Sequence, residues 1–395
     1  MNTLQRLPRN LWVLATTLSL VMTAIPLMVL ISGLLGSELA SNPALATLPL
    51  ACAVIGTAIV TIPAALLVRA KGRRFAGFTG IACVGGGALS GLLATELNSF
   101  TCLLLGAVLI GGAMAFFQQF RFAAIESLSN PADAGPAVSV IMLSGIVSAL
   151  IGPELGAWGR YWPGFAQYSG SFILLLIIVG LAALVFNGFH NPLLQKTDEP
   201  DGGRPLGQVI RQPVFIIALA SAAIGYAVMS FLMTSTPISM HSHHGHSLLD
   251  AKWVIQSHLL AMFLPSLFSG FLLQKFGVLR LMLAGCALYI GVLIVALSGQ
   301  ALIHYWWALV LLGIGWNFLF LAGTTLLSKS HSNAERFKVQ AVNDFSVFSL
   351  QALASLSAGW VLVQYGWSTQ VWLSLLPVGV LLMLALWMFF RRDPL

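Results

Sequence analysis

The chain has 395 residues, of which 58% are hydrophobic and only 8% are charged, and its mean hydropathy is +0.91. About a quarter of the residues in a soluble domain are charged, so this composition excludes a soluble enzyme domain and indicates a membrane protein with many spans. The formal net charge is +7 at pH 7. We attribute this charge to membrane orientation, because basic residues favour cytoplasmic loops, and expect no nucleic-acid partner.

Apolar runs long enough to cross a bilayer predict twelve transmembrane helices. A spanning helix needs about 17–25 predominantly apolar residues, and the expected fold class is an all-α membrane protein. The first run is long and lacks a small-residue cleavage site, so no cleavable signal peptide is expected. The predicted spans are 11–35, 44–68, 75–95, 100–124, 136–157, 167–188, 214–237, 250–273, 279–299, 305–328, 339–363 and 369–390.

The basic residues predict the orientation of these helices. If the N-terminus is inside, nearly all of them lie in or beside inward-facing segments, and only Arg160 and Lys252 lie outside. Both termini are therefore predicted to be cytoplasmic. The loop between the seventh and eighth helices is predicted to face the outside.

A long polar segment, residues 191–213, separates two sets of six predicted helices. Its Pro, Gly and charged residues are typical of a flexible connector. The predicted domains are an N-terminal bundle over 1–190, a cytoplasmic linker over 191–213 and a C-terminal bundle over 214–395. A similar loop follows the second helix of each half: the first copy keeps Gly72, Arg73 and Arg74, and the second has Gly270, Lys275, Gly277 and Arg280.

Twelve helices and this repeated loop resemble the major facilitator superfamily over essentially the whole chain. The resemblance implies two six-helix bundles that rock around a central site. In that family an acidic residue of the first loop faces the start of helix 11, whereas this chain has Arg69 in its place. We hypothesise that Arg69 pairs with Asp344 in the outward-facing state; the alternative is that both are merely solvated. The residues expected to act in gating are Arg69, Asp344, Arg73, Lys275 and Gly277.

Two pairs of residues, each four positions apart, suggest a binding site for a soft metal ion. Met229 and Met233 lie near the end of the seventh predicted helix, and His258 and Met262 near the start of the eighth. Residues four apart share a helix face, and the two motifs lie at similar depths, about 12 Å for Met229 and His258. Thioethers and imidazole suit cuprous copper, although methionine pairs more often fill gaps in apolar interiors.

A histidine-rich segment lies between these two helices. It provides five residues that can collect a metal at the outer face: Met240, His241, His243, His244 and His246. The histidines are alternatively a pH sensor or incidental.

The two motifs resemble one branch of the superfamily, the CcoA-type copper importers, which supply copper for haem-copper oxidase assembly. The resemblance implies import of copper, as Cu(I), across a bacterial inner membrane by alternating access, with the histidine-rich loop facing the periplasm. Copper is then the transported substrate, and no cofactor is expected. Protonation of His258 would weaken metal binding and could couple transport to protons. The protein is expected to be a monomer. Riboflavin transporters belong to the same wider group, so a riboflavin-like importer is the alternative, followed by a proton-coupled drug or metabolite exporter.

Several polar residues inside predicted helices are further candidates, because such groups are costly in a membrane. The possible cavity residues are Gln118, Gln119, Arg121, Trp316 and Asn317. Arg121 is either a substrate or gating residue or, more simply, a partner of Glu126. The segment 152–156 partly resembles a glycine-proline motif of antiporters. With no nucleotide-binding loop or catalytic triad, we expect no enzymatic activity.

Overall fold

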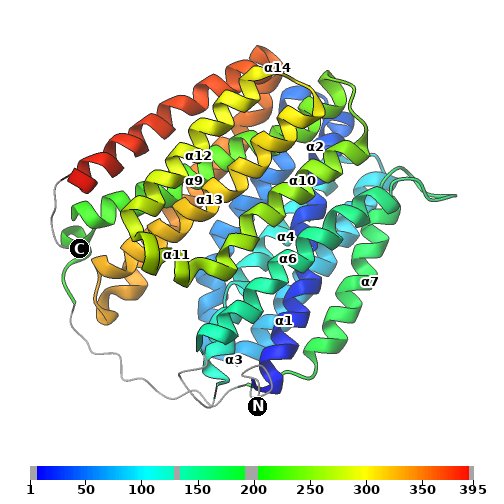
Figure 1. Cartoon of the computed structure of the whole chain (residues 1–395). Helices are drawn as coiled ribbons and strands as arrows, with labels where there is room; N and C mark the ends of the chain where they lie inside the picture. Colours follow the sequence, from blue (N-terminus) through cyan, green and yellow to red (C-terminus); the bar gives the residue numbers. More distant parts are fainter. Residues whose placement is uncertain (1–6, 129–133, 192–202, 391–395) are drawn as a thin grey trace.

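A computed structural model describes residues 7–128, 134–191 and 203–390 (Figure 1), and within them all regular structure is helical. In the first half the helices are α1 (Arg9–Val21), α2 (Ala24–Leu39), the 3₁₀ turn η2 (Pro43–Leu45), α3 (Leu48–Glu96), α4 (Phe100–Phe117), α5 (Phe120–Glu126), α6 (Ala134–Trp158) and α7 (Ser169–Phe186). In the second half they are α8 (Leu206–Ile210), α9 (Pro213–Ile238), the π-helical turn η4 (Ser239–His243), α10 (Leu248–Phe263), the 3₁₀ turn η5 (Leu264–Phe268), α11 (Ser269–Phe276), α12 (Val278–Ser298), α13 (Leu302–Ser330), η6 (Asn333–Glu335) and α14 (Arg336–Phe390).

Nine of the described segments are long and apolar enough to cross a membrane. One of them contains α3, with 49 residues, and another lies within α14, with 55; each of these two helices is long enough for two crossings at about 1.5 Å per residue. A glycine with positive φ interrupts each, Gly72 at 82° and Gly366 at 79°. Only glycine adopts this conformation readily, which explains its place between two spans. The predicted eighth span is not among the nine, because it is divided into α10, η5 and α11. The count of twelve crossings and the cytoplasmic termini stay predictions.

Two predicted spans are broken at prolines. The first is divided at Met22–Thr23: Pro26 has no N–H to donate to the Met22 carbonyl four residues earlier, which accepts instead from the Ile25 N–H at 3.2 Å. The Thr23 hydroxyl donates to the Leu20 carbonyl at 2.6 Å at the same point. The eighth is broken around Pro265, where α10 gives way to η5.

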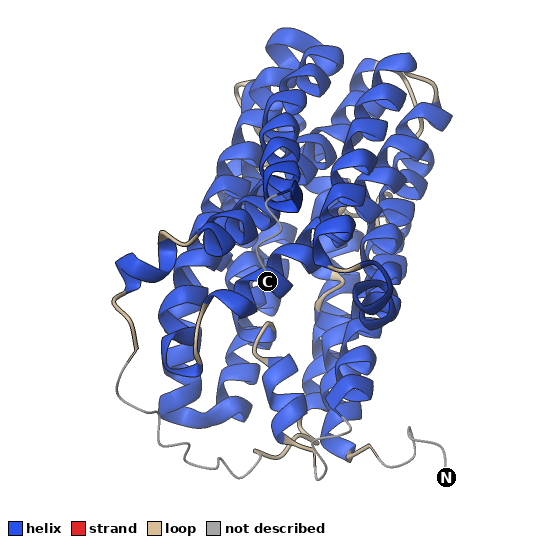
Figure 2. Cartoon of the chain, turned by 60° about the vertical axis from the view of Figure 1, so that its left-hand side comes forward, coloured by secondary structure: helices blue, strands red, loops and turns tan. Residues whose placement is uncertain are grey.

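The two halves pack against each other through α2 with α9, α6 with α10, and α3 with α14 (Figure 2). We call the end of the molecule where α1 and α9 begin the linker end, and the end that carries η4 the histidine end. Two of the described polar contacts between the halves lie at the histidine end. Lys252 Nζ is 2.9 Å from Glu154 Oε1, and the Gly359 N–H donates to Thr47 Oγ1 at 3.1 Å.

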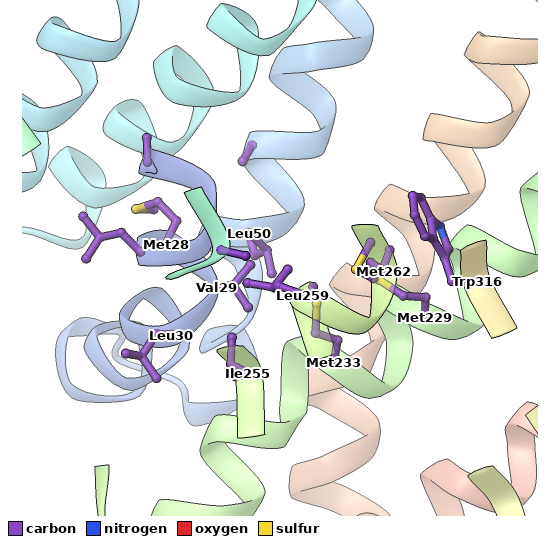
Figure 3. Packing of buried hydrophobic residues seen from close by; sticks show 14 of the residues in the cluster. Met28, Val29, Leu30, Leu50, Met229, Met233, Ile255, Leu259, Met262 and Trp316 are labelled. Carbon is purple, nitrogen blue, oxygen red and sulfur yellow. The ribbon is translucent and has the colours of Figure 1, made fainter. Parts of the chain in front are cut away.

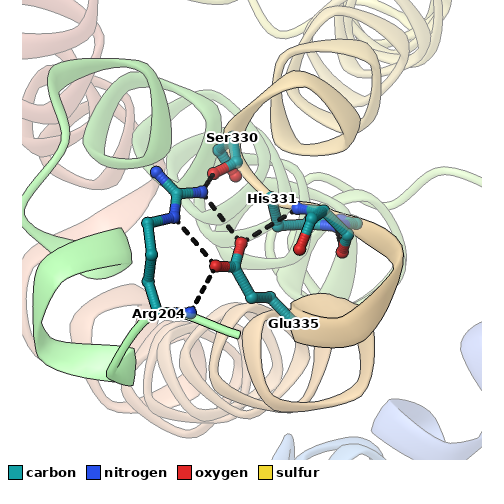
Figure 4. Close-up of polar contacts among 5 residues, drawn as sticks. Arg204, Ser330, His331 and Glu335 are labelled. Carbon is teal, nitrogen blue, oxygen red and sulfur yellow. Dashed lines mark hydrogen bonds and ion pairs between the residues drawn. The ribbon is translucent and has the colours of Figure 1, made fainter. Parts of the chain in front are cut away.

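The ends of the predicted linker are each bound to the adjacent half. The backbone N–H of Arg74 donates to Asn191 Oδ1 at 2.8 Å, which joins the linker start to α3. At the other end, Arg204 forms a bidentate pair with Glu335, with both distances 2.8 Å (Figure 4). Residues 204–213 are therefore not a free connector, since they hold this pair, α8 and the start of α9. The residues between 191 and 203 lie outside the described part of the chain.

Candidate functional site

The four residues of the predicted metal motifs lie on facing parts of α9 and α10. Met229 and Met233 are one turn apart on α9, and His258 and Met262 one turn apart on α10; all four are buried. Figure 3 shows the side chains of Met229, Met233 and Met262 gathered in the same buried region, with Trp316 of α13 at its edge. The structure thus brings the predicted thioethers to one part of the core. Whether they bind a metal stays a prediction.

His258 uses one of its two ring nitrogens in a hydrogen bond. Its side chain is fully buried, and Nδ1 donates its hydrogen to the Leu309 carbonyl at 2.8 Å. That bond leaves the lone pair on Nε2, so Nε2 is an acceptor or a metal ligand. Among the described residues Nε2 has no hydrogen-bond partner. A buried imidazole nitrogen without a partner is costly and marks a position where a ligand can bind.

Close packing of α13 against α10 fixes the position of these residues. A Cβ on Gly313 would lie 2.6 Å from the His258 carbonyl oxygen and 3.1 Å from the Met262 nitrogen. Only glycine lets the two backbones approach this closely. One turn further along α13, Asn317 Nδ2 donates to the Met262 carbonyl at 2.7 Å.

An aromatic cluster adjoins the methionines. The rings of Trp316 and Phe320 stack at 5.1 Å, and Tyr226 of α9 packs edge-on against both. Phe348 of α14 completes the cluster, with its ring 6.1 Å from that of Tyr226. The indole Nε1 of Trp316 is buried and has no partner among the described residues. The predicted cavity residue Trp316 is therefore part of a planar, apolar surface with an unused hydrogen-bond donor, whereas Tyr226 was not predicted.

The structure shows interaction partners for Glu126, Arg121 and Asp344. Glu126 pairs with Arg73, which also donates to the Gln119 carbonyl at 3.4 Å. The described contacts of Glu126 do not include Arg121, and the pairing of these two residues stays a prediction. Arg121 instead interacts electrostatically with Asp344. Asp344 also accepts a hydrogen bond from Asn343 at 3.1 Å. The described contacts of Asp344 do not include Arg69, and the proposed latch between these two residues stays a prediction.

Other residues expected to act in gating or to line a cavity lie toward the linker end. Gly277 has a φ of 75°, which explains the glycine at this loop position, and the Lys275 ammonium lies 5.3 Å from the centre of the Phe271 ring. Gln118 and Gln119 join α4 to α5, and both are half-buried. No described contact places either glutamine beside Trp316, so their role in a common cavity stays a prediction.

The histidine-rich segment is ordered by its own hydrogen bonds. His241 Nδ1 donates to the His246 carbonyl and His244 Nδ1 to the Ser239 carbonyl, both at 2.9 Å, while His246 Nε2 donates to the Gln300 carbonyl at 2.9 Å. Of the four imidazoles, only that of His243 is exposed. Met240 is fully buried and cannot collect a metal at the surface as expected, because η4 turns its side chain into the core.

The sequence matches the Major Facilitator Superfamily over residues 12–251 and 219–395. The chain belongs to the major facilitator superfamily. It is 38% identical to the riboflavin transporter RfnT of Brucella anthropi, over 96% of this chain and 95% of that protein. It is also 30% identical to the uncharacterized MFS-type transporter YddS of Bacillus subtilis, over 92% of this chain and 86% of that protein.

The fold agrees with solved members of the superfamily. A bacterial homologue of the human lysosomal transporter Spinster, in an inward-facing and occupied conformation, superposes with a TM-score of 0.71 over 96% of this chain and 95% of that one, at 16% identity. The expected all-α transporter fold is confirmed. Copper import receives no support from these relatives, and the similarity to a riboflavin transporter favours the alternative that the sequence had placed second.

Proposed function

We propose that this chain imports a small planar heterocycle of the riboflavin class by alternating access. The observation that carries the proposal is the Trp316–Phe320–Tyr226 cluster, which offers stacked rings beside a buried indole N–H without a partner. Stacking on such rings contributes about 0.5–1.5 kcal/mol beyond burial of area. The 38% identity to a riboflavin transporter supports the same substrate class.

Two unpartnered polar atoms, one on α10 and one on α13, complement the groups of a heterocycle that carries both ring carbonyls and a ring N–H. Trp316 Nε1 can donate to a carbonyl, and the lone pair of His258 Nε2 can accept from an N–H. A buried polar atom left without a partner costs about 1–3 kcal/mol. A ligand that satisfies both atoms would relieve this cost, which gives the site a preference for heterocycles over purely apolar molecules.

Cuprous copper is the second candidate substrate. The observation that favours it is the combination of an unpartnered His258 Nε2 with three buried thioethers, from Met229, Met233 and Met262. This is a low-coordinate set of soft and borderline ligands, which suits Cu(I). His243 and the other loop histidines would then deliver copper from the periplasmic side. Residence in a bacterial inner membrane, proton coupling and a monomeric state belong to both proposals.

Parallel uptake measurements distinguish the two substrates. Cells that lack their own riboflavin uptake, and carry this protein at a verified level, are given labelled riboflavin or labelled copper. We expect riboflavin uptake, reduced about tenfold by Trp316→Leu because a stacking surface and a donor are lost together. Met233→Leu, which keeps an apolar side chain of similar volume, is the matched control and should retain riboflavin uptake. Copper uptake that is abolished by Met233→Leu and His258→Gln, without riboflavin uptake, would establish the second candidate instead.

A further inference from the structure

The break in the predicted eighth span is at Pro265, three residues after Met262 of the candidate site. Pro265 has no N–H, and its ring clashes with the carbonyl four residues earlier, which favours the change from α10 to η5 at this point. In the 3₁₀ pattern of η5, the donor for the Met262 carbonyl would be the N–H of residue 265, which proline lacks. Inside a membrane such a carbonyl requires a partner from a neighbouring element.

Asn317 supplies that partner. Its side chain is 2% exposed, and its amide Nδ2 donates to the Met262 carbonyl at 2.7 Å and to the Ser266 hydroxyl at 2.6 Å. Met262 precedes Pro265 and Ser266 follows it, so one amide group holds both sides of the break. The close approach at Gly313 brings α13 near enough for this contact.

The break separates two parts with different attachments. On one side, α10 carries His258 and Met262 and is tied to the first half by Gln256, whose Nε2 donates to the Leu150 carbonyl at 2.9 Å. On the other side, α11 carries Lys275 and ends at Phe276, directly before Gly277 of the loop expected to act in gating. The break therefore allows the angle between α10 and α11 to change when the linker end moves and the histidine end stays in contact.

We propose that Asn317 is a positioning residue for transport, whose amide fixes the joint at Pro265 between the site-bearing α10 and the loop-bearing α11. The role does not depend on which substrate is carried. With the amide in place, α11 takes a defined orientation relative to α13. Without it, the Met262 carbonyl loses its donor and the orientation of α11 becomes variable, while α10 keeps its packing at the histidine end.

Spin-label distances in the full-length protein, reconstituted in lipid after replacement of its four cysteines, test this role. One pair, Gln274→Cys with Ser328→Cys, joins the exposed linker ends of α11 and α13. The control pair, Leu249→Cys with Ile303→Cys, joins exposed positions at the histidine ends of α10 and α13. Asn317→Leu, which is similar in size but cannot donate, should widen the first distance distribution about twofold and leave the control pair unchanged.

A second substitution separates the hydrogen bond from simple packing. Pro265→Ala restores an N–H at position 265, so the Met262 carbonyl regains a donor within its own helix. Adding Pro265→Ala to Asn317→Leu should therefore return the first distribution to its original width. An unchanged first pair in Asn317→Leu, equal widening of both pairs, or no recovery in the double variant would overturn the proposal. If Asn317→Leu alone yields no folded protein, recovery of folding by Pro265→Ala supports the proposal, and failure to recover overturns it.

Discussion

Glycine at position 111 is required by the contact between α4 and α3. A Cβ there would lie 1.8 Å from the Ala53 carbonyl oxygen, and the Gly111 carbonyl accepts a hydrogen bond from Thr57 Oγ1 at 2.7 Å. We expect Gly111→Ala to lower the free energy of unfolding by about 1–3 kcal/mol, because backbone must move away from backbone. The matched control is Gly180→Ala on α7, where a Cβ meets nothing within 4 Å. Gly180→Ala should raise the free energy of unfolding by at most about 1 kcal/mol, because alanine has a higher helix propensity than glycine. Thermal unfolding in detergent measures both, and equal effects would contradict the prediction.

The pair between Arg204 and Glu335 predicts a specific pH dependence. Hydrogen bonds from the Arg204 side chain and from the Ser332 N–H hold the pKa of the Glu335 carboxyl well below its usual value of 4.5. Because the folded-state pKa is lowered, the stabilisation is present above about pH 4.5 and is lost as the pH falls further toward the lowered pKa. Glu335→Gln should therefore be less stable than the natural chain at pH 7, with a smaller difference at pH 3.5.

Unfolding curves at the two pH values measure this difference. The control is the double variant Arg204→Gln with Glu335→Gln. Its stability should depend on pH in the same way as that of Glu335→Gln, because the carboxylate that pairs with Arg204 is already absent. A difference between the natural chain and Glu335→Gln that is the same at both pH values would show that the carboxylate charge does not stabilise this contact.

At the scale of elements, α6 and α10 are joined at the histidine end by a charge pair that involves Glu154 of the antiporter-like segment 152–156. Glu154 of that segment contacts Lys252 and accepts a hydrogen bond from Gln256 Nε2 at 3.2 Å. The side chains of Lys252 and Glu154 are 17% and 28% exposed, so water screens the pair only in part. The glutamate is thus used for contact between the halves, which weakens its interpretation as an exchange motif.

A double-mutant cycle tests this contact. Glu154→Gln and Lys252→Met should together show a coupling energy of about 0.2–1 kcal/mol, the usual range for partly exposed pairs. The measurement is thermal unfolding in detergent at low and high salt, and the coupling should fall with salt. A coupling energy of zero at low salt would mean that the two charges do not stabilise the interface.

At the scale of the whole molecule, each end of the predicted linker is bound within the half that it adjoins. Asn191 is bound to Arg74 of the first half, and Arg204 to Glu335 of the second. We therefore expect fragments 1–191 and 203–395, produced together, to assemble through α2 with α9, α6 with α10, and α3 with α14. Co-purification through a tag on one fragment measures assembly, with each fragment expressed alone as the control. Failure to co-purify, when both fragments are stable, would show that the linker itself holds the halves together.

The fold class could be predicted from the sequence because it depends on local properties. Apolar runs of span length predict membrane helices wherever they occur, and four-residue spacing placed Met229 with Met233, and His258 with Met262, on shared helix faces. Gly72 and Gly277 were recognised from the repeated loop, and both have the positive φ that only glycine adopts readily. The break at Pro265 was missed, since the apolar run continues through it and proline is common in membrane helices.

The sequence by itself therefore determined an all-α membrane transporter and the helix faces that carry its candidate site. Only the tertiary structure decided which groups meet across helices: Glu126 with Arg73, 53 residues apart, and Arg204 with Glu335, 131 residues apart. It also decided that Asn317 spans the break and that Met240 is buried. The physical reason is that periodicity fixes the direction of a side chain relative to its own helix. The partner depends on how helices distant in sequence pack, and no local pattern records that.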